Sequence, residues 1–364
     1  YLPWVELRRA KISPTAVILF TSGSEAKPKA VPLSHQNIIS NYKDYLVLAK
    51  IRKNERLLGM LPPFHSFGLA CGVILPLCTG IKFAFHANPN EGAILADMID
   101  RYQLSILLGT PTFVYGILRV ATPNQLRSVR LAVTGAEKCP EYVYQKIKEL
   151  CPHAIICEGY GITECSPVVT LNNPDHPMIG SLGKVLQSME YCVVHPESIP
   201  MQKNPPGEKG LLLVRGPNVF SGYLNHPTSP FVELSGKKWY NTGDLVTEDD
   251  KGIITFVGRL KRFIKMGGEM ISLVAIEEAL SKHYPANDDG PSIAVESIDN
   301  DNTSNPELIL FTTQDVTREQ VNQQIRSEGL SGLYNIRRII KKEKIPLLGT
   351  GKTDYRQLKD LFQK

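Results

Sequence analysis

The sequence predicts an α/β protein in which a large, mostly parallel sheet precedes a β-rich subdomain and a small α+β domain. Two observations carry this prediction. Short apolar runs alternate with segments of helical periodicity in the first half of the chain, which is typical of a parallel sheet covered by helices. The pattern changes at two points, to closely spaced short strands after Ser181 and to mixed helices and strands after Gly258. We therefore expect three parts, 1–180, 181–258 and 259–364.

The first part is expected to begin with a buried strand over 15–20 that runs into a loop of small residues. A helix should open at 34–37 with Ser34 as its N-cap. Apolar runs that predict strands and periodic segments that predict helices then alternate. The predicted strands are 104–108, 129–133 and 154–157, and the predicted helices include 92–102 and 141–150.

The two later parts have their own expected elements. Between 181 and 258 short β-like runs predict a compact subdomain; they are 189–194, 210–214 and 253–257. After 258 we expect a separate domain of about 100 residues. Its predicted helices are 273–283 and 318–328, and its predicted strands are 292–297 and 307–312.

The composition excludes several classes of protein. The chain has 364 residues, 42% hydrophobic and 21% charged, which excludes a disordered or fibrous protein. A net charge of +5 is too diffuse to indicate nucleic-acid binding. The seven cysteines form no C-x-x-C pair and have no histidine at metal-ligand spacing. We therefore expect no zinc site, and free thiols in a reducing cytosol.

The cellular location and the start of the chain can also be read from the sequence. The longest apolar stretch, 67–81, is interrupted by Pro76 and is shorter than the roughly 20 residues that a spanning helix needs. We therefore expect a cytoplasmic protein. The chain starts at Tyr1 without an initiator Met, so we expect the native protein to begin further upstream.

Four polar segments carry candidate chemistry. Residues 21–29 (TSGSEAKPK) offer hydroxyls, a glycine and lysines after a strand, which suits phosphate oxygens as well as an ordinary polar turn. Residues 158–164 (EGYGITE) end in Glu164, which could ligate Mg²⁺ beside a phosphate or lie on the surface. In 240–244 (YNTGD), Asp244 after a tight turn suits a ribose diol. In 349–353 (GTGKT), Lys352 suits a developing anionic charge or is an exposed turn lysine.

The order and spacing of the four segments resemble the adenylate-forming superfamily, which includes acyl-CoA synthetases, luciferases and peptide-synthetase adenylation domains. The resemblance covers essentially the whole chain. The run 258–273 (GRLKRFIKMGGEMISL) and the TSGSE loop look most like acyl-acyl-carrier-protein synthetases that form the C-terminal half of a bifunctional 2-acylglycerophosphoethanolamine acyltransferase. The resemblance implies the adenylate-forming fold with a large domain truncated at its N-terminal end, because the family has well over about a hundred residues before the phosphate loop.

The resemblance implies a two-step reaction with ATP and Mg²⁺. A fatty acid attacks the α-phosphate of ATP, giving acyl-adenylate and pyrophosphate, and a pantetheine thiol of acyl carrier protein then takes the acyl group. Coenzyme A is the alternative acceptor, which would make the protein a long-chain fatty acid–CoA ligase. A nucleotide-binding fragment without turnover is the alternative from another class. A lysophospholipid acceptor would be served by a domain upstream of Tyr1, in a protein that can lie peripherally at the inner face of the membrane.

The resemblance also implies a role for individual residues. Those expected to hold the β- and γ-phosphates are Thr21, Ser22, Gly23, Ser24 and Lys29. Thr163 would contact the α-phosphate and Glu164 would ligate Mg²⁺. The adenine pocket would comprise Gly135, Ala136, Glu137, Glu158, Gly159 and Tyr160, with Tyr160 stacked on the base. Asp244 and Arg259 would hold the ribose.

Three further positions follow from the resemblance. Lys352 would stabilise the charge that develops between the carboxylate and the α-phosphate. Lys261 matches the hinge about which the small domain rotates. His65 falls at the aromatic position of the substrate gate, although a core histidine is the alternative. The basic run 337–344 fits either a solvated strand edge or a docking surface for an acidic carrier protein or the phosphates of CoA.

Overall fold

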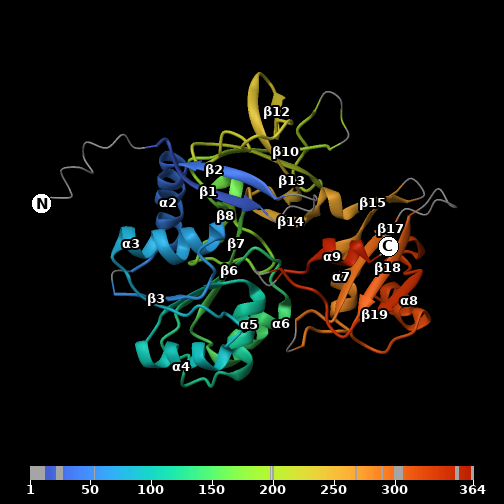
Figure 1. Cartoon of the computed structure of the whole chain (residues 1–364), viewed down its shortest axis with the longest axis horizontal. Coiled ribbons are helices and arrows are strands. Elements are labelled where there is room, and N and C mark those ends of the chain that lie inside the picture. Colours follow the sequence, from blue (N-terminus) through green and yellow to red (C-terminus); the bar gives the residue numbers. More distant parts are fainter. Residues whose placement is uncertain are drawn as a thin grey trace, which may run out of the picture.

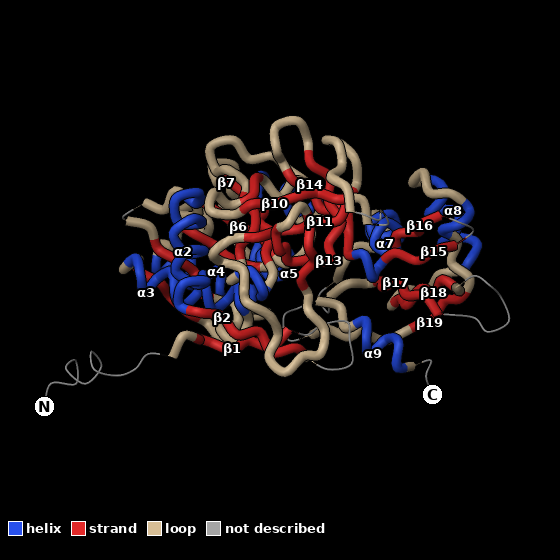
Figure 2. Tube along the Cα trace, turned by 90° about the horizontal axis from the view of Figure 1, so that it is seen from above, coloured by secondary structure: helices blue, strands red, loops and turns tan. Residues whose placement is uncertain are grey.

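The computed structural model describes residues 13–21, 28–52, 54–196, 198, 201–266, 269–287, 290–298, 306–348 and 352–361. A seven-stranded sheet with its helices forms the body of the molecule, and the C-terminal elements gather at one end of it (Figures 1 and 2). Among the described residues, no helix is long and apolar enough to cross a membrane.

The seven-stranded sheet has the strand order β4-β3-β5-β6-β7-β8-β9. The first five of these strands run parallel. Strand β8 pairs antiparallel with β7, and β9 pairs antiparallel with β8. Their bounds are Lys82–Phe85, Arg56–Gly59, Ile106–Gly109, Leu131–Gly135, Ile155–Gly161, Val168–Leu171 and Lys184–Val185 in that order. Strands β5 and β6 are buried along their whole length, as parallel strands covered on both faces are. The predicted α/β fold with a mostly parallel sheet is confirmed.

Helices cover this sheet on both sides and fill two separate apolar cores. They are α2 (His35–Ala49), η1 (Gly68–Ile74), α3 (Leu75–Thr79), α4 (Gly92–Tyr102), α5 (Pro111–Val120) and α6 (Glu141–Leu150). The predicted start of α2 is confirmed, since the Ser34 hydroxyl accepts from the Asn37 N–H at 3.0 Å. The Asn37 side chain accepts in turn from the Ser34 N–H at 2.9 Å, which completes a capping box.

The first predicted strand is corrected by the structure. Strand β1 (Thr15–Thr21) pairs antiparallel with β2 (Lys29–Ser34) in a separate two-stranded sheet. It is not buried, because the side chain of Phe20 is 62% exposed and only Leu19 is enclosed. The connection from Thr21 to Lys29 is too short for the crossover that parallel pairing requires, so the two strands form a hairpin.

Gly68, the first residue of η1, permits a close backbone approach. A Cβ atom added to Gly68 would lie 2.1 Å from the carbonyl oxygen of Pro62, whereas one added to Gly72 in the same helix meets nothing within 4 Å. We expect Gly68→Ala to lower the free energy of unfolding by about 1–3 kcal/mol, as overpacked positions do. Urea denaturation measures this change. The matched variant Gly72→Ala should leave stability unchanged or higher, and equal stability of the two variants would contradict the steric argument.

The β-rich part is an antiparallel sheet of order β10-β11-β13-β12, with β14 paired to β13. The bounds of β10 to β14 are Glu190–Val194, Gly210–Arg215, Phe231–Leu234, Lys237–Glu248 and Ile254–Arg259. Asp244 lies inside the long strand β13 and not after a free turn as expected. At this point β13 bulges, because Leu211 and Leu213 of β11 pair with Leu245 and Asn241 of β13, so that a two-residue step in β11 matches a four-residue step in β13. Gly243, inside that stretch, has φ +72°. A bulge redirects side chains, and it brings Asp244 opposite Arg259 of β14.

The C-terminal part begins with the 3₁₀-helix η3 (Leu260–Arg262) directly after β14. Its strands are β15 (Phe263–Met266), β16 (Glu269–Ser272), β17 (Ile293–Ile298), β18 (Glu307–Thr312) and β19 (Arg338–Lys341), and its helices are α7 (Leu273–Ser281), α8 (Arg318–Ser327), η4 (Gly332–Tyr334) and α9 (Tyr355–Asp360). Strand β18 pairs antiparallel with β17 and parallel with β19, around a core of its own.

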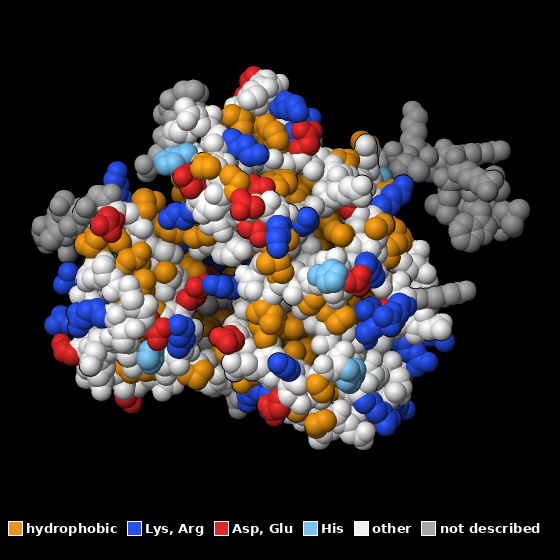
Figure 3. Space-filling view, turned by 180° about the vertical axis from the view of Figure 1, so that it is seen from behind, with side chains coloured by type: hydrophobic (Ala, Val, Ile, Leu, Met, Phe, Trp, Pro, Cys, Tyr) orange, Lys and Arg blue, Asp and Glu red, His pale blue; other side chains and the backbone are white. Residues whose placement is uncertain are grey.

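Half of the basic run 337–344 lies on the edge strand β19. Two of its side chains pair with acidic neighbours, Arg338 with Glu307 and Lys341 with Asp315. On the face seen in Figure 3, Lys and Arg side chains are interspersed with Asp and Glu. The positive charge is therefore mixed with negative charge on that face.

Candidate active site

A large cleft lies between the C-terminal part and the rest of the molecule. Its volume of about 3020 Å³ exceeds the roughly 300–1,000 Å³ of a site for one drug-sized ligand. Of the predicted site residues, those lining it are Thr21, Lys29, His65, Gly135, Ala136, Glu137, Gly159, Tyr160, Thr163, Glu164, Asp244, Arg259, Lys261 and Lys352. Segments far apart in the sequence thus meet at one site. Ser22, Gly23 and Ser24 lie outside the described residues.

The carboxyl ends of β6 and β7 form one wall of the cleft. Gly135 is the register partner of Gly159, and a Cβ atom on Gly135 would lie 3.1 Å from the Gly159 carbonyl oxygen. Ala136 follows with φ +71°, a left-handed conformation that a residue with a side chain seldom adopts. The two glycines and Ala136 carry little or no side chain, which suits close approach of a flat ring.

Asp244, Arg259 and Tyr160 form a connected polar group in the cleft. The Tyr160 hydroxyl donates to Asp244 Oδ2 at 2.5 Å, and Arg259 Nε lies 3.0 Å from Asp244 Oδ1. The Asp244 side chain is 1% exposed, whereas that of Arg259 is 56% exposed. Burial raises the pKa of the Asp244 carboxyl, and the Arg259 charge opposes that shift.

One oxygen of this carboxylate is ready to accept a hydroxyl donor. Asp244 Oδ1 is buried, and its contact with Arg259 Nε at 3.0 Å is an ion pair without good hydrogen-bond geometry. The oxygen can therefore still accept a hydrogen bond from a ligand hydroxyl. The Asp244 carboxylate therefore fits the predicted contact with a ribose diol.

Thr163 and Glu164 lie on the short 3₁₀-helix η2 (Thr163–Cys165) just after β7. The Thr163 hydroxyl is 3.2 Å from that of Ser66, and Glu164 Oε1 accepts from the Tyr223 hydroxyl at 2.6 Å. The Lys29 ammonium stands 5.1 Å from the centroid of the Tyr223 ring. Hydroxyl, carboxylate and ammonium groups are thereby brought together at one end of the cleft.

Glu164 is the predicted magnesium ligand. No group of three or more His, Cys, Asp or Glu side chains arranged for a metal exists in the part of the chain that the structure describes. A single carboxylate fits Mg²⁺, which is commonly held by one or two carboxylates, several waters and the phosphates of a nucleotide. It does not fit zinc, which needs at least three protein ligands.

Lys352 reaches the cleft on a hairpin of the C-terminal part. The Leu348 N–H donates to the Lys352 carbonyl at 2.7 Å, and the Asp354 N–H donates to the Pro346 carbonyl at 2.8 Å. Residues 349–351, the tip of the predicted glycine loop, lie outside the described residues. The paired arms on both sides of the tip hold Lys352 at a defined position.

The ammonium group of Lys352 faces charges of both signs. Burial and the charge of Arg259 lower its pKa, and Glu137 and Asp244 oppose that shift. Burial raises the pKa of Glu137, whose carboxylate accepts from the Thr112 hydroxyl at 2.9 Å. A partly desolvated cation interacts more strongly with a nearby negative charge than a solvated one does.

His65 lies near the same group, three residues before η1 begins at Gly68. Burial lowers its pKa, and the charge of Lys352 lowers it further. Its ring centroid is 4.6 Å from that of Phe64, whose side chain is 64% exposed. His65 thus lies at the cleft surface and not in the core, as the gate prediction requires.

Glu158 is an exception among the predicted residues, because it does not line the cleft. Its carboxylate is buried, where it accepts from the Tyr144 hydroxyl and, at 3.0 Å, from the Cys139 N–H. These bonds hold the segment between β6 and α6. Gly159 and Tyr160 thus line the cleft, whereas the Glu158 side chain lies behind its wall.

Three residues of the site are not expected from the motifs: Ser66, Thr112 and Tyr223. Each acts on a predicted residue through a hydroxyl group. Ser66 lies in the segment 62–68 that contains His65, so it could have been predicted from the same motif. Thr112 and Tyr223 stand in no motif, and their proximity results only from the fold.

The sequence is similar to that of known enzymes. The model of the AMP-binding enzyme family matches residues 5–224. The medium-chain fatty-acid–CoA ligase of Escherichia coli K12 is 31% identical over 75% of this chain and 48% of the relative. The 4-coumarate–CoA ligase 3 of Arabidopsis thaliana is 28% identical over 86% of this chain and 57% of the relative.

Solved structures have the same fold. ATP-bound MatB from Rhodopseudomonas palustris superposes with a TM-score of 0.84 and 24% identity, over 96% of this chain and 68% of that one. MenE from Bacillus subtilis, in complex with ATP and magnesium ion, gives 0.80 and 23%, over 95% and 70%. The chain spans about half to two thirds of the length of the curated relatives. With more than half of its residues matched by the family model, the chain belongs to the AMP-binding enzymes and has the adenylate-forming fold.

Proposed function

We propose that the protein activates a carboxylic acid with ATP and Mg²⁺ and then transfers the acyl group to a pantetheine thiol. The observation that carries the proposal is the position of Lys352, which enters the cleft that also holds the Asp244–Arg259–Tyr160 group. A cation from one part of the molecule thereby faces a ribose-type site on the other. The relatives whose names are acyl–CoA ligases support the same reaction class.

In the first step, a carboxylate oxygen of the acid attacks the α-phosphorus of ATP. The bond from that phosphorus to the bridging oxygen breaks, and pyrophosphate leaves with the electron pair. Asp244 would hold the ribose hydroxyls, Thr163 the α-phosphate, and Thr21 and Lys29 the outer phosphates. Glu164 would hold Mg²⁺, which neutralises phosphate charge when bound. Lys352 would stabilise the negative charge shared by the carboxylate and the α-phosphate.

The second step requires the space that Lys352 occupies. Lys261, in the three-residue segment η3 between β14 and β15, lies where a change of a few dihedrals would rotate the C-terminal part. The thiol could then attack the acyl carbon and lose its proton to water, and AMP would leave with the electron pair of the broken carbon–oxygen bond. We propose Lys261 as this hinge.

We propose a fatty acid as the acyl substrate and acyl carrier protein as the thiol acceptor. Apolar residues between η1 and the sheet, among them Cys71, Leu75 and Ile106, line the cleft and suit an alkyl chain. The 258–273 run supports the carrier protein. Coenzyme A is the second candidate, favoured by the names of the relatives. We also propose a cytoplasmic protein that serves lysophospholipid reacylation through a domain outside this chain.

The experiment that tests this function offers both acceptors to one enzyme preparation. With ATP, Mg²⁺ and a fatty acid, we expect exchange of labelled pyrophosphate into ATP without any thiol, and acyl-thioester on addition of acyl carrier protein. Faster thioester formation with CoA at equal concentration would assign the CoA ligase function instead. Absence of exchange with every acid tested, from acetate to palmitate, would overturn the adenylation proposal.

A further inference from the structure

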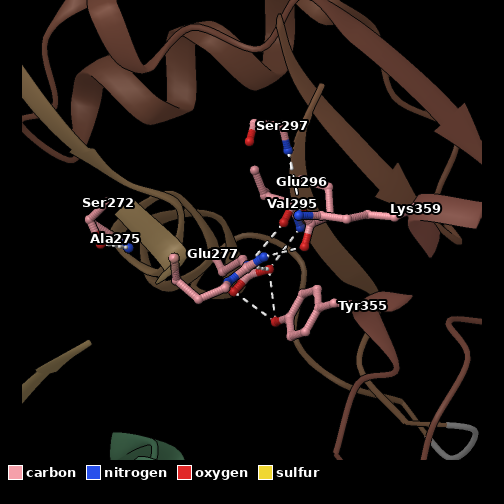
Figure 4. Close-up of polar contacts among 9 residues, drawn as sticks. Ser272, Ala275, Glu277, Val295, Glu296, Ser297, Tyr355 and Lys359 are labelled. Carbon is pink, nitrogen blue, oxygen red and sulfur yellow. Dashed lines mark hydrogen bonds and ion pairs between the residues drawn. The ribbon is translucent and has the colours of Figure 1, made fainter. Parts of the chain in front are cut away.

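A charged cluster lies in the C-terminal part, where its members line that side of the cleft (Figure 4). Its core is largely enclosed, with Arg262 13% and Glu296 2% exposed, whereas Lys359 at its margin is 51% exposed. We call it the Arg262 cluster, and its members are Arg262, Glu277, Glu296, Tyr355 and Lys359. Arg262 is the last residue of η3 and directly follows the proposed hinge, Lys261. The other four members come from α7, β17 and α9.

Arg262 has partners on three sides. One terminal nitrogen donates to Glu296 Oε1 at 2.6 Å, and the other donates to Glu277 Oε1 and to the Val295 carbonyl, both at 2.9 Å. The guanidinium carbon stands 3.8 Å from the centroid of the Tyr355 ring. A planar guanidinium can make in-plane hydrogen bonds and stack on a ring at once, which an ammonium group cannot do.

Tyr355 connects Arg262 with the segment that carries Lys352. Its hydroxyl lies 3.0 Å from both carboxylate oxygens of Glu277, and its ring stacks on Arg262. From the same helix, Lys359 pairs with Glu296 Oε2 at 3.2 Å. Two polar contacts therefore hold helix α9 in place, one to Glu277 and one to Glu296. Both carboxylates are also partners of Arg262, the residue that adjoins the hinge.

Helix α9 in turn fixes the hairpin. Its N-cap Asp354 accepts from the Gln357 N–H at 3.1 Å and donates its own N–H to the Pro346 carbonyl. Tyr355 stands three residues after Lys352, and Leu358 anchors the helix in an apolar core. Movement of α9 would consequently move Lys352.

The chemistry of the cluster favours orientation over bulk stability as its role. Buried ion pairs add little stability compared with apolar packing, because their groups lose hydration. An apolar core with Leu358 already holds the helix in place. What the charged cluster adds is direction, since hydrogen bonds to a guanidinium and a carboxylate fix angles as well as distances.

We propose that Arg262 is a positioning residue for Lys352: through Glu277 and Tyr355 it ties the catalytic hairpin to the hinge, so that the C-terminal part carries Lys352 into the cleft in one fixed orientation. This inference rests on the proposed function, because Lys352 is taken as the cation of the adenylation step. Misplacement of a catalytic group by about 1 Å can reduce a rate by about 100-fold.

The test compares Arg262→Met, Arg262→Lys and Tyr355→Phe in the full chain. We expect Arg262→Met to lower kcat of pyrophosphate exchange by about 10- to 100-fold with an unchanged KM for ATP, because the proposed contacts with the ribose and the outer phosphates lie outside the C-terminal part. Tyr355→Phe, which keeps the stacked ring, should lower kcat less, and Arg262→Lys should restore part of the loss. Thioester formation from added acyl-adenylate should stay unchanged, since Lys352 is not used there.

A second readout does not depend on turnover. The reactivity of Lys352 toward acetic anhydride is followed against pH by peptide mass spectrometry. In the native chain the pH at which Lys352 reacts at half its maximal rate should lie below that of a free lysine side chain in a short peptide, because Lys352 is partly buried and faces Arg259 and His65 as well as Glu137 and Asp244. In Arg262→Met this pH should move upward toward the value of the free lysine.

The matched control is Tyr334→Phe, on η4 of the C-terminal part. Its kcat for pyrophosphate exchange and its pH profile of Lys352 labelling should equal those of the native chain. Native kcat and a native Lys352 profile in Arg262→Met would overturn the inference. If Arg262→Met does not fold, the same two measurements are made on Tyr355→Phe. A lower kcat with a shifted Lys352 profile would support the inference, and native values of both would overturn it. Absence of exchange in the native chain would overturn the proposed function instead, while the labelling profile would still test the position of Lys352.

Discussion

Replacing Lys352 with Ala is expected to lower the rate of acyl-adenylate formation by about 10²- to 10³-fold, the range found when one pre-positioned donor is removed from developing negative charge. The structure supplies the reason, because the ammonium group is partly desolvated and its position is fixed by paired hairpin arms. Single-turnover formation of acyl-adenylate measures the effect. The KM for ATP should change little, because Asp244 and Arg259 remain.

The pH dependence of the same step gives this prediction a second signature. Burial and Arg259 lower the pKa of Lys352, so its protonated form is lost at a lower pH than that of an ordinary lysine. Only the protonated amine stabilises the transition state. The native rate should therefore fall as the pH rises through that lowered pKa, and Lys352→Ala should lack this alkaline decline.

Lys341→Ala is the matched control for Lys352→Ala. Lys341 stands on the edge strand β19, where its exposed side chain pairs with Asp315. Exposed pairs contribute roughly 0–1 kcal/mol, so this variant should keep both the native rate and the native pH profile. An equal loss of rate in both variants would show that charge in general, and not the position of Lys352, governs the reaction.

The sequence alone predicted much of this site because the motifs are local in the chain. Strand ends followed by glycines or hydroxyls indicated the walls of the cleft, and the motif around Lys352 indicated the cation. The burial of β1 was misjudged, because an apolar run does not tell how many of its faces are covered. The contacts of the Glu158 carboxylate could not be predicted, because its partner Tyr144 lies on another element.

Two features depend on contacts between distant residues and leave no local signal. The bulge that directs Asp244 toward Arg259 arises from unequal pairing of β11 and β13. The stacking of Arg262 on Tyr355 joins positions 93 apart in the chain. Each residue by itself reads as an ordinary charged or aromatic position, so the sequence indicates the groups of the site but not the contacts that orient them.

Asp244→Asn is expected to raise the KM for ATP by about 10- to 100-fold while the protein remains as stable as the native chain. Hydrogen bonds to a charged group contribute about 1.5–3 kcal/mol each, and one such contact to a ribose hydroxyl accounts for this range. The effect should be specific to the ribose. Measured with 2′,3′-dideoxy-ATP, which lacks both hydroxyls, the native and variant enzymes should have similar KM values.

The stability half of this prediction follows from the pKa of Asp244. Burial raises that pKa in the folded state, so the stability contributed by the protonated carboxyl is present below the unfolded-state pKa and is lost as the pH rises through the folded-state value. At neutral pH the native chain thus carries a buried charge that Asn lacks. Arg259 loses its partner, but its half-exposed side chain stays hydrated. Thermal unfolding at pH 7 should give Asp244→Asn a midpoint no lower than the native one. A clearly lower midpoint would mean that the ion pair with Arg259 stabilises the fold, and the higher KM would then report lost structure and not a lost ribose contact.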